Sequence, residues 1–96
     1  MNFNVLKKEY YLMEKLSANT INEKIRSFII NSVKIPDLSS DDNLFETGIV
    51  NSLFAIQMMT FLEKTFSIRV TTDDLLMENF KSVNSATSFV LQKKNS

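Results

Sequence analysis

The chain has 96 residues, enough for one small domain, and its 44% hydrophobic and 23% charged residues are typical of a folded protein. Eleven basic and eleven acidic residues cancel, which argues against nucleic acid or an anionic membrane as a partner recognised by bulk charge. The absence of cysteine and histidine excludes disulfides, zinc sites built on sulfur or imidazole, and catalysis by either residue. No apolar run could span a bilayer or serve as a signal peptide, so we expect a cytoplasmic protein. We also expect it to be a monomer.

The first predicted helix covers residues 20–33. Thr20 and Glu23 have the T-x-x-E spacing of a capping box, which marks a helix start. Apolar residues then recur on one helical face: Ile21, Ile25, Phe28 and Ile29. Pro36 ends the helix, because the residue before a proline is pushed out of the α region. Residues 1–19 are only loosely helical in their apolar spacing, so they form either an additional helix or a frayed extension.

A loop over residues 34–51 holds the one glycine and the one proline of the chain. Its apolar residues are expected to pin it to the helices: Leu44, Phe45, Ile49 and Val50. A second helix is predicted over residues 52–65, with Asn51 as its N-cap. At about 100° per residue, its core face holds Ala55, Met58, Met59, Leu62 and Phe66. Leu53 and Ile56 fall on the polar face, and Phe54 and Phe61 lie at the boundary.

Two shorter helices complete the chain. The segment TTDDLLMENF predicts a short third helix capped by Thr71 or Thr72. Residues 82–93 predict the last helix, with Ser82 as its cap and these residues facing inward: Val83, Ala86, Phe89 and Val90. The stretch FSIRV is assigned to extended loop, because no second strand exists to pair with it. The predicted fold class is all-α, a four-helix bundle with a long first loop and a short third helix.

Ser52 stands where the loop becomes the second helix, within GIVNSLFAIQMM. A serine at this place is usually a cap or a solvated residue. Here Asn51 can already supply the cap, and the apolar Leu53 and Ile56 beside Ser52 indicate a surface that meets a partner. A nucleophilic serine would need a base, and the chain has neither histidine nor a G-x-S-x-G or S-x-x-K motif. We therefore expect no enzyme, and the acidic clusters lack the pattern of a metal site.

The stretch resembles the acyl carrier protein family, in which an acidic loop with a buried aromatic and a glycine turn precedes Asp-Ser-Leu at the start of the second helix. The matching residues are Asp41, Asp42, Leu44, Phe45, Gly48, Asn51, Ser52 and Leu53. The resemblance covers residues 20–93 as a carrier domain and leaves an N-terminal extension, 1–19, and a tail, 94–96. It implies a bundle of acyl-carrier-protein type with 4′-phosphopantetheine attached covalently to Ser52, and an acyl group held on its thiol as a thioester.

The chain departs from the family pattern in two ways. Asn51 stands where most members have aspartate, and Glu63 and Lys64 are the only charged residues of the second helix after Ser52. Docking to partners should therefore be more hydrophobic and less salt-sensitive than is usual in fatty-acid synthesis. The residues expected to recognise partners are Asn51, Leu53, Phe54, Ile56, Gln57, Thr60 and Val70, with Phe61 adding to the apolar character. The cargo is expected near Ile56, Met59, Val70 and Leu75.

The string NSLFAIQMMTFLEKTFSIRV is similar to free-standing carriers of hydroxymalonyl or methoxymalonyl extender units. This similarity implies a role in polyketide or hybrid polyketide/peptide biosynthesis, antibiotic biosynthesis included. The implied partners are a phosphopantetheinyl transferase, an acyl-loading enzyme, acyl dehydrogenases and a polyketide synthase acyltransferase. Two alternatives stay open: a D-alanyl or aminoacyl carrier, and a helical adaptor without a prosthetic group, in which Ser52 would be an ordinary helix-start residue.

Overall fold

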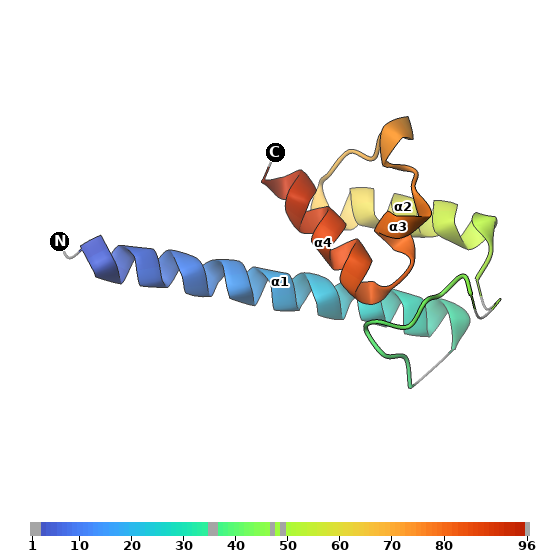
Figure 1. The fold of residues 1–96 in the computed structure, drawn as a ribbon, viewed down its shortest axis with the longest axis horizontal. Helices are drawn as coiled ribbons and strands as arrows, with labels where there is room; N and C mark the ends of the chain where they lie inside the picture. The colour runs from blue at the N-terminus through green and yellow to red at the C-terminus, as the bar shows by residue number, and fades with distance from the viewer. Residues whose placement is uncertain (1–2, 35–36, 47, 49, 96) are drawn as a thin grey trace.

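The computed structural model describes residues 3–34, 37–46, 48 and 50–95, with side chains from Ser17 onward, and these residues contain helices and loops but no strand (Figure 1). The elements are α1 (Phe3–Val33), α2 (Ser52–Phe66), a 3₁₀ turn η1 (Thr72–Asp74), α3 (Met77–Phe80) and α4 (Val83–Lys94). The predicted all-α class with a long first loop and a short third helix is confirmed. Among the described residues, no helix combines the length and the apolar character needed to cross a membrane.

α1 is one continuous helix of 31 residues, so the predicted helix start at Thr20 is wrong. A capping box stabilises a helix only where the first N–H groups lack acceptors. Thr20 follows more than four turns of helix. The amides that Thr20 and Glu23 would have capped therefore donate to backbone carbonyl groups one turn earlier in α1. The N-terminal half of α1 extends away from the other helices (Figure 1), which gives the fold a longest dimension of 53 Å.

The core is built from the four α-helices and the long loop, and α3 contributes Phe80. The buried apolar side chains are Ile21, Ile25, Ile29, Leu38, Leu44, Val50, Phe54, Met58, Leu62, Phe66, Phe80, Val83, Ala86, Phe89 and Val90. The predicted core faces are confirmed for all four residues of α4 and for Ile21, Ile25 and Ile29 of α1, whereas Phe28, predicted on the same face of α1, is only half-buried. In α2, Met58, Leu62 and Phe66 are buried, whereas Ala55 and Met59 are only half-buried.

The segment predicted as a single third helix is divided into η1 and α3. The N–H and hydroxyl groups of Thr71 both donate to the Asp74 carboxylate, over 2.8 and 2.9 Å. Leu76 is extended, with φ −112° and ψ 134°, and separates η1 from α3. Ser82 caps α4 as predicted, since its hydroxyl oxygen accepts the Ser85 N–H at 3.0 Å.

Polar contacts anchor the long loop to α1 and α4. The Arg26 guanidinium donates to the Leu38 carbonyl and the Ser40 hydroxyl. The Asn84 side chain accepts from Asn22 at 3.0 Å and donates to the Asp41 carboxylate at 2.7 Å.

The end of the loop that leads into α2 is held mainly by apolar burial. The Leu44 N–H donates to the Lys81 carbonyl at 2.7 Å, and the Leu44 and Val50 side chains are buried, with Phe45 half-buried. The predicted apolar pinning of the loop is confirmed for these three residues, while Ile49 lies outside the described residues. Leu44, Phe45 and Val50 therefore tie the loop to the core before α2 begins.

Candidate functional site

Asn51 holds the start of α2. Its backbone is extended, with φ −127° and ψ −173°, and its side-chain oxygen accepts the Phe54 N–H at 3.1 Å. Its carbonyl oxygen accepts the Ala55 N–H at 3.1 Å, which is the first bond of the helix. The predicted N-cap is confirmed, and Ser52 becomes the first helical residue.

Ser52 is exposed, and its side chain makes no hydrogen bond to another described residue. The N–H groups of Ser52 and Leu53 lie in the first turn, where an α-helix offers them no acceptor. Such unpaired donors, together with the helix dipole, favour an anion at this end of α2. The Ser52 hydroxyl is thus placed where a phosphodiester would be accessible and electrostatically favoured.

A groove of ≈ 390 Å³ opens between α2 and the segment that carries η1 and α3, and Ser52 is one of its lining residues. The other lining residues are Phe45, Ala55, Ile56, Met59, Leu75, Leu76, Met77 and Phe80. Ser52 is therefore the one polar side chain in an apolar lining that holds no charge. Of the residues predicted to lie near a cargo, Ile56, Met59 and Leu75 line this groove, whereas Val70 does not.

Large apolar side chains are exposed around this groove. Among the described side chains, those with large exposed fractions are Leu53 (62%), Ile56 (56%), Leu75 (49%), Leu76 (58%) and Met77 (62%). We refer to these five residues as the apolar rim. Helical spacing predicted a surface position for Leu53 and Ile56, but no pattern predicted a partner contact for Leu76 or Met77. The run Leu75-Leu76-Met77 after a capped polar turn was the signal that could have identified them.

Two predicted contributors to the docking surface lie elsewhere. The Phe54 side chain is only 7% exposed and belongs to the core, so its assignment to partner recognition is wrong. Its ring centroid lies 5.9 Å from that of Phe28 on α1. Phe61 stacks on the same Phe28 ring, with 4.3 Å between centroids and 6° between planes. Helical spacing placed both rings at the boundary, and packing against α1 turned both inward.

The remaining predicted recognition residues divide into two groups. Gln57 and Thr60 are exposed on α2, and the Thr60 hydroxyl donates to the Ile56 carbonyl at 3.2 Å. Val70 is half-buried, and its N–H donates to the Glu63 carboxylate at 3.0 Å. Glu63 is the one acidic residue of α2. Through the bond from the Val70 N–H, its carboxylate anchors the segment that follows the helix.

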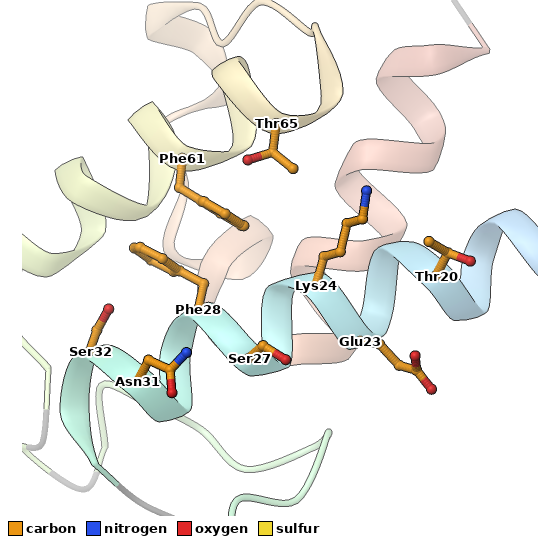
Figure 2. Close-up of a pocket in the computed structure, with 9 residues that line it drawn as sticks. All are labelled: Thr20, Glu23, Lys24, Ser27, Phe28, Asn31, Ser32, Phe61 and Thr65. Atoms are coloured by element: carbon orange, nitrogen blue, oxygen red, sulfur yellow. The ribbon is translucent and has the colours of Figure 1, made fainter.

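A larger hollow of ≈ 650 Å³ lies between α1 and α2, away from Ser52. Figure 2 shows the stacked Phe28 and Phe61 rings at one end of it and Lys24, Glu23 and Thr20 at the other. Seven of its nine lining residues are polar or charged, and Ser52 is not among the nine. Of the two hollows, the groove beside Ser52 combines an apolar lining with an exposed hydroxyl.

The comparisons with known proteins identify the family. No curated protein matches the chain with significant sequence similarity. The family model described as "phosphopantetheine attachment site" matches residues 23–90, more than two thirds of the chain. Domains of this family carry acyl groups on a 4′-phosphopantetheine arm bound covalently to a serine, catalyse no reaction themselves, and meet phosphopantetheinyl transferases and other partner enzymes. With its helical bundle and its exposed serine at a helix start, this chain belongs to the phosphopantetheine-attachment family of carrier proteins.

Proposed function

We propose that Ser52 is the serine to which 4′-phosphopantetheine is attached. The observation that carries this proposal is the exposed Ser52 hydroxyl at the first turn of α2, beside an apolar groove. Unpaired first-turn N–H groups favour the negative charge of a phosphodiester there. The match of Asn51-Ser52-Leu53 to the carrier pattern supports the same residue.

The protein's own residues present and support this attachment point. Asn51 caps α2 and so fixes the direction in which Ser52 points. Val50, buried directly before this cap, ties the chain to the core, and a rigid helix start lowers the entropy lost when a partner enzyme binds. When bound, the phosphopantetheine arm supplies the thiol on which an acyl group travels as a thioester.

We propose that partner enzymes dock on the apolar rim together with Asn51, Gln57 and Thr60. The rim surrounds the groove and contains no charged residue. Glu63 is engaged by the Val70 N–H, so α2 offers partners no carboxylate close to Ser52. This arrangement supports docking by apolar contact, and Val70 would act through the shape of the segment that follows α2.

We propose as cargo a malonyl-type extender unit, of the hydroxymalonyl or methoxymalonyl kind, for polyketide or hybrid polyketide/peptide biosynthesis in the cytoplasm. The similarity of residues 51–70 to carriers of such units supports it. The groove lining holds no cation for a carboxylate, so the charged end of the unit would stay in water while the arm lies along the groove. The pathway partners would be an acyl-loading enzyme, acyl dehydrogenases and a synthase acyltransferase.

Intact mass tests the attachment site. Purified protein is incubated with coenzyme A and a broad-specificity phosphopantetheinyl transferase, beside Ser52→Ala and the control Ser88→Ala, which changes an exposed serine of α4. The expected result is a gain of one phosphopantetheine group in the wild type and in Ser88→Ala, and no gain in Ser52→Ala. No gain in the wild type with several transferases would favour the adaptor without a prosthetic group.

The cargo requires a separate experiment on the loaded protein. The form carrying phosphopantetheine is offered to enzymes that load malonyl-type units and to a D-alanine-activating ligase, and the thioester formed is read by mass. Loading by the first group alone would support the extender-unit carrier. Loading by the ligase alone would overturn it and establish the aminoacyl carrier.

A further inference from the structure

The outer wall of the groove beside Ser52 is the segment from Thr71 to Met77. It has little regular structure, since it holds one 3₁₀ turn and the first residue of α3. Its three groove-lining side chains, Leu75, Leu76 and Met77, are each about half exposed or more. A segment with few buried apolar contacts opens at low free-energy cost. Apolar packing therefore holds this wall only weakly.

Polar contacts centred on Asp74 hold the wall instead. The Lys93 ammonium lies 2.5 Å from the Asp74 carboxylate and joins the wall to the last turn of α4. The Asn79 side chain donates to the Asp74 carbonyl at 2.8 Å, and this bond ties the wall to α3. Lys93 is itself placed by α4, with its Nζ 5.8 Å from the centre of the Phe89 ring.

The ion pair is partly shielded from water. The side chains of Lys93 and Asp74 are 25% and 19% exposed, so solvent and salt screen their attraction less than that of a fully exposed pair. Asp73, the neighbouring acid, is exposed and forms no ion pair among the described residues. Asp74 thus differs from its neighbour in its bond to α4 and in the two bonds that it accepts from Thr71.

We propose that the Asp74–Lys93 ion pair is a latch that keeps the outer wall of the groove in place, and that the groove widens when this pair breaks. Leu75 and Leu76 follow Asp74 directly, so release of Asp74 from α4 frees the side chains that form the wall. A single partly exposed ion pair contributes a small stabilisation, and opening is therefore accessible without unfolding of the bundle.

We expect the latch to control access to the phosphopantetheine arm. This role rests on the proposed attachment of the arm to Ser52. With the latch formed, the wall lies over the path of the arm and shields it from water. A partner that docks on the apolar rim contacts Leu75, Leu76 and Met77, and it can draw the wall outward against the latch and the Asn79 bond to the Asp74 carbonyl. The energy needed to release the arm is then set by these two polar contacts rather than by the hydrophobic core.

Methyl relaxation dispersion on the full-length protein without its prosthetic group tests the latch. The Leu75 and Leu76 methyl groups report opening of the wall, and the Leu62 methyl groups, in the buried core, report any change in the bundle. The variants are Asp74→Asn, Lys93→Gln and their combination. Asp74→Asn keeps an oxygen that can accept from Thr71 and removes only the charge. Asp73→Asn is the matched control.

The expected result is a several-fold rise in the open population at Leu75 and Leu76 in Asp74→Asn and in Lys93→Gln, with no further rise in the double variant. Asp73→Asn and the Leu62 signals should match the wild type. Equal populations in Asp74→Asn and Asp73→Asn would overturn the latch, and so would effects of the two single variants that add fully in the double variant.

A second measurement connects the latch to the arm. A transferase attaches an arm with an environment-sensitive fluorophore, taken from a fluorescent coenzyme A analogue, to the wild type, Asp74→Asn and Asp73→Asn. The emission of Asp74→Asn should shift to the red, toward that of the fluorophore in water, and the other two should agree. Equal emission of all three would overturn the shielding role. Failure of attachment in all three would overturn the proposed function, while the methyl data would still decide the latch.

Discussion

Leu53→Ala tests whether partners bind through the apolar rim. Complete burial of a leucine side chain contributes about 1.5–3 kcal/mol. In the free protein 62% of Leu53 is exposed, so a partner that covers it gains roughly 1–2 kcal/mol from that side chain. Alanine retains a small part of this gain. The substitution should therefore raise the KM of a phosphopantetheinyl transferase for the protein by about five- to tenfold.

The assay compares transferase kinetics with stability. The kcat should change little, because Leu53 lies beside the Ser52 hydroxyl, the proposed attachment point, and does not take part in the chemistry. The free energy of unfolding in urea, followed by circular dichroism, should change by less than about 0.5 kcal/mol. Lys64→Ala is the control, since Lys64 is also exposed on α2 but lies three turns from Ser52.

Salt distinguishes apolar docking from charge-driven docking. The KM of the wild type should change by less than about twofold between roughly 50 and 500 mM NaCl, because screening weakens exposed charge pairs and leaves apolar contact intact. Apolar docking is refuted if Leu53→Ala leaves the KM unchanged, or if the KM rises steeply with salt and Lys64→Ala alters it more than Leu53→Ala does.

Three further predictions concern the supports of the site. Asn51→Ala should lower the free energy of unfolding by about 1 kcal/mol, because the Phe54 N–H loses its acceptor, whereas Asn51→Asp should not; urea titration of both variants checks this. Gly48→Ala should cost about 1 kcal/mol in the same titration although a Cβ meets no neighbour, because φ is +72°; a variant as stable as the wild type would contradict the backbone geometry. The hydrogen bond from Lys93, and then the Thr71 N–H, hold the pKa of Asp74 below its ordinary value of 3.8. Ionised Asp74 therefore stabilises the fold above pH 3.8, and this stabilisation is lost as the pH falls through the lower folded value; acid titration of Asp74→Asn against Asp73→Asn should show it missing in the former only.

Local patterns in the sequence determined much of this fold. The bounds of α2 and α4, their caps at Asn51 and Ser82, and the long loop between α1 and α2 follow from side chains within a few residues of each boundary. Cap oxygens and helical apolar spacing act over one or two turns, which a sequence displays directly. The exposure of Ser52 and Leu53 was predictable for the same reason.

Local patterns failed where the outcome depended on segments far apart in the chain. The capping box at Thr20 had no effect, because the preceding residues continue the helix. Phe54 entered the core because the Phe28 ring of α1 lies against it, and no spacing within α2 contains that contact.

The sequence by itself determined α2, α4, the loop and the exposed serine at the start of α2. Only the tertiary structure decided what surrounds that serine. It brought Leu75, Leu76 and Met77 across from Ile56 to make an apolar groove, and it joined Asp74 to Lys93 across eighteen intervening residues. Side-chain chemistry and short-range spacing can be read directly from the amino-acid sequence, whereas a groove between two segments depends on how the whole chain packs.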